Sequence, residues 1–186
     1  MVRLIGLAFE REDAEVRVST SNNAAYQQCC GVGITYLKNE WYYQAVAVRA
    51  LLPTFRFRVQ PEYRITCGSH RFDLGFFGQS SPEPVALGEI KLWMGDTAEQ
   101  GIPSMIEDCK TLATAQCPTF LLVFTANPTG ETTKNLEYLL GRLHALGETE
   151  LYKFLTPFVH HGGCLKEGEF AIFAGLLSSG RLAAAH

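Results

Sequence analysis

Two apolar runs joined by a short turn, between Arg71 and Trp93, are the feature that most constrains how this chain can fold. The runs HRFDLGFF and VALGEIKLW have the length of strands, and the linker GQSSPEP is rich in turn-forming residues. Side chains of the second run alternate between two faces, one of which carries Leu87, Glu89, Lys91 and Trp93. Asp73, Glu89 and Lys91 therefore place charges inside strands, where burial costs free energy unless each charge is paired, hydrogen-bonded or bound to a metal.

The segments on either side of these strands predict a regular order of elements. Residues 39–53 predict a helix, because Asn39 can cap its start, Glu40 lies at its positive end and Pro53 stops it. Residues 54–65 alternate between apolar and polar side chains, as a half-exposed strand does. The patterns that follow Trp93 predict a helix over 104–116, a buried strand over 119–127 and an amphipathic helix over 131–146.

This order predicts a mixed α/β fold of the α+β type, with helices on the faces of a mixed sheet and a helix–strand–strand–strand–helix–strand core. The first three strands are closely spaced and are expected to be antiparallel. The fourth follows a crossover helix and is expected to run parallel to one of them.

The two ends of the chain are expected to add to this core. Residues 3–9 and 14–20 are expected to form strands, and residues 151–159 and 168–177 can each add a strand or a helix. We expect a single domain over 1–182, with an N-terminal extension over 1–38, the core over 39–127 and a C-terminal part over 128–182. Residues 183–186 are interpreted as a remnant of an expression tag.

Composition and charge narrow the functional classes. Apolar residues make up 47% of the 186 residues, enough for a substantial core, and no apolar run approaches the length of a membrane span. The six cysteines form no CxxC pair and no secretion signal is evident, so we expect reduced thiols and a cytoplasmic protein. The net charge of −3 does not indicate a nucleic-acid-binding protein by itself. Four arginines near the strands can contact phosphates or simply serve solubility: Arg56, Arg58, Arg64 and Arg71.

The three strand charges can build a metal site. Glu89 and Lys91 project from one face, and Asp73 meets them if it points the same way from the neighbouring strand. Two adjacent carboxylates repel each other, and a bound Mg²⁺ removes that penalty because hard cations take carboxylate and carbonyl oxygens. The backbone carbonyl of Ile90 is expected near the same point. Lys91 could then hold a water molecule for attack on phosphorus.

Asp73 followed by Glu89-Ile90-Lys91 on adjacent strands, after a helix and before a helix and a fourth strand, resembles the PD-(D/E)xK nuclease superfamily. The resemblance covers residues 39–127 and implies a restriction-endonuclease-like fold. It implies that Asp73, Glu89 and the Ile90 carbonyl bind the metal, that Lys91 is the catalytic lysine, and that Glu40 touches the metal or orients water. Phe72 stands where many members have the proline of the motif, and no QxxxY motif is evident.

The sequence therefore predicts a Mg²⁺-dependent nuclease, with DNA as the expected substrate and Mn²⁺ able to replace Mg²⁺. A second copy of the chain or a carrier protein is the expected partner. The alternative is a non-catalytic protein-interaction domain on the same fold, and a third hypothesis is a hydrolase that uses Cys164 and a histidine. His70 is grouped with the four arginines, as a phosphate contact or a residue that serves solubility. Four acidic residues either tune the metal or favour the start of a helix: Asp96, Glu99, Glu107 and Asp108.

Overall fold

A computed structural model describes most of the chain, in ten helices and strands. The described residues are 1–23, 33–34, 39–53, 56–64, 70–94, 98–128, 130–143, 149–161 and 165–177. In chain order the elements are α1 (Val2–Ser21), α2 (Glu40–Leu51), β1 (Arg58–Arg64), β2 (Arg71–Phe77), β3 (Pro84–Met94), α3 (Ala98–Ala113), β4 (Thr119–Pro128), α4 (Thr132–Leu143), β5 (Thr149–His161) and β6 (Leu165–Leu177).

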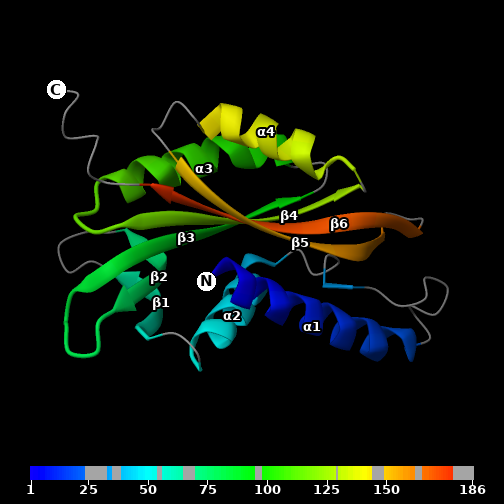
Figure 1. Ribbon diagram of the computed structural model, residues 1–186, viewed down its shortest axis with the longest axis horizontal. Coiled ribbons are helices and arrows are strands. Elements are labelled where there is room, and N and C mark those ends of the chain that lie inside the picture. Colours follow the sequence, from blue (N-terminus) through cyan, green and yellow to red (C-terminus); the bar gives the residue numbers. More distant parts are fainter. Residues whose placement is uncertain are drawn as a thin grey trace.

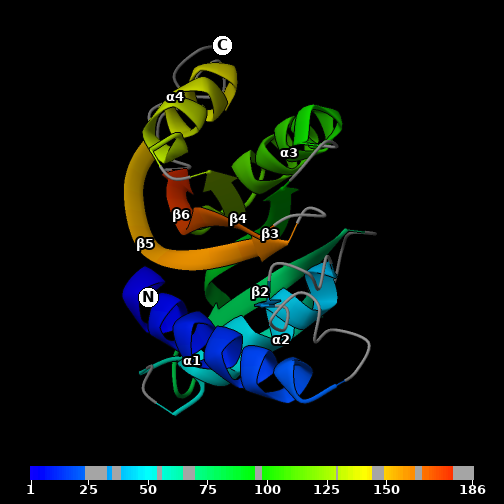
Figure 2. The same cartoon turned by 90° about the vertical axis from the view of Figure 1, so that its right-hand side faces the viewer.

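The strands form one sheet that is sandwiched between two layers of helices. Its order is β1-β2-β3-β4-β6-β5, with α1 and α2 on one face and α3 and α4 on the other (Figures 1 and 2). Strands β1, β2 and β3 pair antiparallel, and β4 pairs parallel to β3 after the crossover through α3. The fold is therefore mixed α/β. The predicted order of elements from α2 to β4 and the predicted strand directions are confirmed.

Helix α2 begins and ends where its sequence predicts. The Asn39 side chain accepts a hydrogen bond of 3.0 Å from the backbone N–H of Trp41, so it satisfies one of the donors that a helix start leaves unpaired. Glu40 lies in the first turn and Arg49 in the last, each at the end of the helix dipole that favours its charge. The helix ends at Leu51, two residues before Pro53.

The N-terminal residues correct a prediction. The strands expected over 3–9 and 14–20 are wrong, because both segments belong to the single helix α1. Val2, Ile5 and Phe9 are buried along one side of it, at the three- and four-residue spacing of a helix. That spacing runs through the short apolar stretch that was interpreted as a strand. Helix α1 packs on α2 and on the sheet and contributes to the core.

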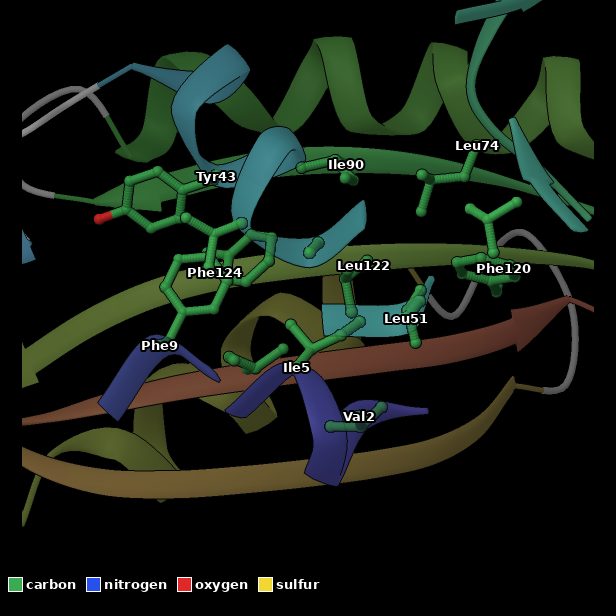
Figure 3. Packing of buried hydrophobic residues seen from close by; sticks show 14 of the residues in the cluster. Val2, Ile5, Phe9, Tyr43, Leu51, Leu74, Ile90, Phe120, Leu122 and Phe124 are labelled. Carbon is green, nitrogen blue, oxygen red and sulfur yellow. The ribbon is translucent and has the colours of Figure 1, made fainter. Parts of the chain in front are cut away.

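Two hydrophobic clusters lie on the two faces of the sheet. In the first, Phe9 of α1 and Tyr43 of α2 pack on Phe124 of β4, with ring centroids 4.7 and 5.1 Å from that of Phe124 (Figure 3). The second lies under α3 and α4 and includes Leu87 and Trp93 of β3. Because Ile90 lies in the first cluster, the alternation predicted for this strand is confirmed.

The remaining expectations are met in part. Strand β1 spans 58–64 rather than 54–65, and residues 54, 55 and 65 lie outside the described residues. Both C-terminal segments that were left open are strands, β5 and β6. Within the described residues, no helix has the length and apolar character that a membrane span requires.

Candidate active site

The candidate site lies where strands β2 and β3 diverge. They pair from Phe77↔Pro84 to Leu74↔Gly88, with a register shift between Phe76 and Phe77, and beyond Gly88 strand β3 continues to Met94 paired with β4 on its other side. The backbone groups of this part of β3 that face away from β4 therefore need other partners. Hydrogen-bonding groups of a buried backbone are almost always satisfied, so the question is which side chains satisfy them.

Two carboxylates accept hydrogen bonds from this open edge. Asp73 Oδ2 accepts a hydrogen bond of 2.7 Å from the backbone N–H of Ile90, and the Glu40 carboxylate accepts one from the backbone of Leu92. Positions 90 and 92 lie two residues apart, so their N–H groups point to the same edge of the strand. The carbonyl of Ile90 points to that edge as well, because the N–H and C=O of one strand residue face the same neighbour.

Helix α2 bridges the two diverging strands. Gln44 lies one turn after Glu40, and its buried side-chain amide donates to the backbone carbonyl of Asp73 at 2.9 Å and to Glu62 Oε1 at 3.0 Å. Glu62 also pairs with Arg71, and it has a φ of 54°, which is rare for a residue other than glycine. One side of α2 therefore holds β3 through Glu40 and β2 through Gln44.

Glu89 is the most buried ionisable side chain of the site. It is 4% exposed, and its Oε1 lies 2.8 Å from His70 Nε2. Burial, and then the charge of Asp73 and a hydrogen bond with it, raise the pKa of Glu89 to about 9. In the absence of a bound cation, the Glu89 carboxyl therefore holds a proton more tightly than an exposed glutamate does.

Lys91 lies between carboxylates from both faces of the sheet. Its Nζ is 3.6 Å from Glu40 Oε1 of α2 and 3.2 Å from Asp108 Oδ2 of α3. Burial lowers the pKa of Lys91, but Glu40 and Asp108 raise it by more, so the net shift is upward. The side chain is an ammonium ion at neutral pH.

Asp108 and Glu40 differ in how well they are satisfied. Asp108 Oδ2 is buried and has no hydrogen bond of good geometry, although the Lys91 ammonium is within ion-pair distance. Burial raises the pKa of Glu40, and Lys91 lowers it by less, so its net shift is also upward. The site thus contains a buried oxygen without a hydrogen bond, Asp108 Oδ2, and a carboxyl of raised pKa, Glu40.

The donor chemistry of the site fits a hard divalent cation. Glu40 and Asp108 lie within ion-pair distance of Lys91, and burial together with the neighbouring Asp73 charge raises the pKa of Glu89. Among the described residues, no three His, Cys, Asp or Glu side chains are already arranged around one point as metal ligands. Two carboxylates and the Ile90 carbonyl are nevertheless a suitable set for Mg²⁺, which keeps several of its water ligands.

Some predicted site residues come together and others do not. Asp73, Glu89, Lys91 and Glu40 converge at the open edge of β3, as the contacts above show. The four arginines are all exposed but fall into two groups. Arg64 and Arg71 are cross-strand partners, whereas Arg58 stacks over Phe77 at the far end of β1, about 20 Å away along the strand.

Four residues have contacts in the site that the sequence analysis did not assign to them. Gln44 and Glu62 were not considered, His70 was grouped with the arginines rather than with Glu89, and Asp108 was weighed mainly as a helix-start acid. The four-residue spacing of Glu40 and Gln44 on a predicted helix is the one signal that could have placed Gln44 beside Glu40.

The thiol hypothesis concerns Cys164, and the two described cysteines, Cys109 and Cys117, do not test it. Cys109 is buried, and burial raises the pKa of its thiol to about 12. Cys164 lies outside the described residues.

Comparisons of the chain with protein-family models, with curated proteins and with solved structures gave no match.

Proposed function

We propose that this protein is a metal-dependent nuclease with a restriction-endonuclease-like core, and that it hydrolyses phosphodiester bonds of DNA. The observation that carries the proposal is the convergence of Asp73, Glu89 and Lys91, with Glu40, at the point where β2 and β3 diverge. In a surface ion-pair cluster, Glu89 would not need to be almost fully buried beside Asp73. Burial and the Asp73 charge raise the pKa of Glu89, and a bound cation would stabilise its ionised form.

Asp73, Glu89 and the Ile90 carbonyl would hold the cation. When bound, a Mg²⁺ ion supplies positive charge to polarise a phosphoryl oxygen and to lower the pKa of a bound water molecule. Asp73 already has one oxygen fixed by the Ile90 N–H, and Gln44 holds its backbone, so this ligand is positioned before a cation arrives.

Lys91 and Glu40 would act on the attacking water. Because Lys91 stays protonated, it acts as a hydrogen-bond donor and positive charge that orients the water and the phosphate, and not as a base. Glu40 lies 3.6 Å from Lys91 and is partly exposed, and its raised pKa suits it to accept the water proton. The water oxygen bonds to phosphorus, the bond to the leaving oxygen breaks, and that oxygen takes a proton from solvent.

The test is cleavage of plasmid and single-stranded DNA in Mg²⁺, Mn²⁺ or EDTA by the wild-type protein and by Lys91→Gln. Lys110→Gln is the matched control, because Lys110 lies on α3, its side chain is exposed, and it forms an ion pair with Glu107 of the same helix. We expect cleavage that needs the metal, is lost by at least about 100-fold in Lys91→Gln and is retained in Lys110→Gln. Cleavage that survives EDTA or Lys91→Gln would contradict the proposal.

A second candidate function is a non-catalytic protein-interaction domain. The observation that favours it is that ionisable side chains of the site already contact one another within the chain: Lys91 contacts Glu40 and Asp108, Glu89 contacts His70, and Arg71 contacts Glu62. In this case the carboxylates only satisfy the open edge of β3. This candidate predicts no cleavage and no stabilisation by divalent cations.

A further inference from the structure

We propose that His70 is a third side-chain ligand of the cation, beside Asp73 and Glu89, so that the site favours Mn²⁺ over Mg²⁺. The inference rests on the proposed metal-dependent function and adds a residue that the sequence had grouped with the phosphate contacts. It also predicts which cation the site selects, because imidazole nitrogen is a better ligand for transition metals, whereas an all-oxygen set suits Mg²⁺.

The position of the imidazole supports this role. His70 Nε2 lies 2.8 Å from Glu89 Oε1, and Glu89 in turn shares a hydrogen bond with Asp73. Two atoms bonded at about 2.1 Å to one octahedral ion lie about 3 Å apart, so the His70–Glu89 separation matches that of two ligands of one ion. A bound cation would replace the present hydrogen bond by two metal–ligand bonds.

The His70 ring packs against a buried residue on one side and is partly exposed to solvent. Its ring packs edge-on against the buried Phe72 ring, with centroids 4.7 Å apart, and this contact fixes the side of the imidazole that faces Glu89. The His70 side chain is 39% exposed, compared with 5% for Glu89, so a hydrated ion can approach from the His70 side. No three such side chains are arranged around one point among the described residues, so binding requires a rearrangement, and His70 is the more exposed member of the His70–Glu89 pair.

The alternative is that His70 only satisfies the buried Glu89 carboxyl by a hydrogen bond. Both roles predict a loss of stability when His70 is removed, so stability alone does not distinguish them. The measurement must report the nitrogen on the metal.

Pulsed electron paramagnetic resonance of the Mn²⁺-loaded protein detects imidazole nitrogen coupled to the metal, and Mn²⁺ and Mg²⁺ affinities follow from calorimetry. The variants are His70→Gln, which keeps a hydrogen-bonding side chain but removes the imidazole, and His160→Asn, which removes an imidazole on β5, a strand that β4 and β6 separate from β3. We expect nitrogen coupling in the wild type and in His160→Asn, its loss in His70→Gln, and a Mn²⁺ affinity reduced by at least about tenfold in His70→Gln with a smaller loss for Mg²⁺.

Mn²⁺ that binds the wild type without nitrogen coupling, or coupling that persists in His70→Gln, would overturn the assignment of His70. Metal-dependent cleavage would still support the proposed function in that case. A wild-type protein that binds no Mn²⁺ would overturn both. The wild-type spectrum decides the question even if His70→Gln does not fold.

Discussion

The side-chain amide of Gln44 donates a hydrogen bond of 2.9 Å to the backbone carbonyl of Asp73. Its other contact is Glu62, so a single buried amide connects α2 to both β1 and β2 beside the site. These two hydrogen bonds explain why α2 has a buried glutamine one turn after Glu40. Glu40 satisfies a backbone group of β3 beyond the end of its pairing with β2, and Gln44 satisfies the Asp73 carbonyl opposite Glu62, the position that the pairing of β1 and β2 skips.

Substitution of this amide is expected to weaken both the fold and the site. Gln44→Met keeps a similar volume but leaves the Asp73 carbonyl and Glu62 Oε1 without the amide that donates to them, at a cost of about 1–3 kcal/mol in the free energy of unfolding. Cation affinity should fall as well, because Asp73 is less well positioned. Urea unfolding and Mg²⁺ calorimetry measure the two effects, with Gln60→Met on the exposed part of β1 as the control. Equal behaviour of the two variants would contradict the positioning role.

Glu89 is expected to make the metal-free protein less stable as the pH rises. Its folded-state pKa is about 9 and its ordinary value is 4.5, so between these values the folded protein binds more protons than the unfolded chain. The free energy of unfolding therefore falls as the pH increases through this window, and the contribution is most favourable below pH 4.5. His70, Asp73, Lys91 and Asp108 are the charged or titratable groups around it.

Glu89→Gln mimics the protonated carboxyl and removes this pH dependence. In EDTA, the Tm of the variant minus that of the wild type should be larger at pH 8.5 than at pH 5.5. Each kcal/mol by which the wild type loses free energy of unfolding between these pH values should change this difference by about 2–4 °C. The exposed Glu107→Gln is the control, because that side chain is largely exposed on α3. A Tm difference that is the same at both pH values would show that Glu89 is not protonated in the folded state.

Gly88 is expected to be essential for the packing beside the site. It pairs with Leu74 on β2 and with Phe120 on β4, and a Cβ at this position would overlap the Phe120 ring. Gly88→Ala should therefore destabilise the protein by about 1–3 kcal/mol. Gly141→Ala is the matched comparison, because Gly141 lies on α4 with open space around it, and it should stabilise by about 0.5–1 kcal/mol. Thermal unfolding of both variants measures the contrast, and a neutral Gly88→Ala would contradict the packing.

Much of the core was predictable because its signals are local. The period of two in residues 85–93 placed Glu89 and Lys91 on the face of Leu87 and Trp93, and Asn39 marked the start of α2. The strands expected in α1 were wrong because seven-residue apolar stretches fit both periods over a short window. The longer spacing of Val2, Ile5 and Phe9 was the better indicator.

Contacts between distant segments were not predictable in the same way. Asp108 reaches Lys91 from α3, and His70 reaches Glu89 from the residue before β2, over 17 and 19 positions of sequence. The contacts of Asp108 and His70 depend on how α3 and β2 pack, and no residue spacing in the sequence predicts that packing. The open edge of β3 likewise follows from where β2 stops pairing, and this determines which backbone groups Asp73 and Glu40 satisfy.

Binding of Mg²⁺ tests the central claim most directly, because it separates a metal site from an ion-pair cluster that only supports β3. The measurement is the Tm and the calorimetric titration of the wild type, of Asp73→Asn and of the exposed control Glu107→Gln. Asparagine at position 73 keeps an oxygen for the Ile90 N–H but removes the charge. We predict that Mg²⁺ at about 100 times its Kd stabilises the wild type and the control by about 2.7 kcal/mol, and Asp73→Asn far less. An unchanged wild-type Tm with no heat of binding, in Mg²⁺ and in Mn²⁺ alike, would contradict the account and favour the interaction domain.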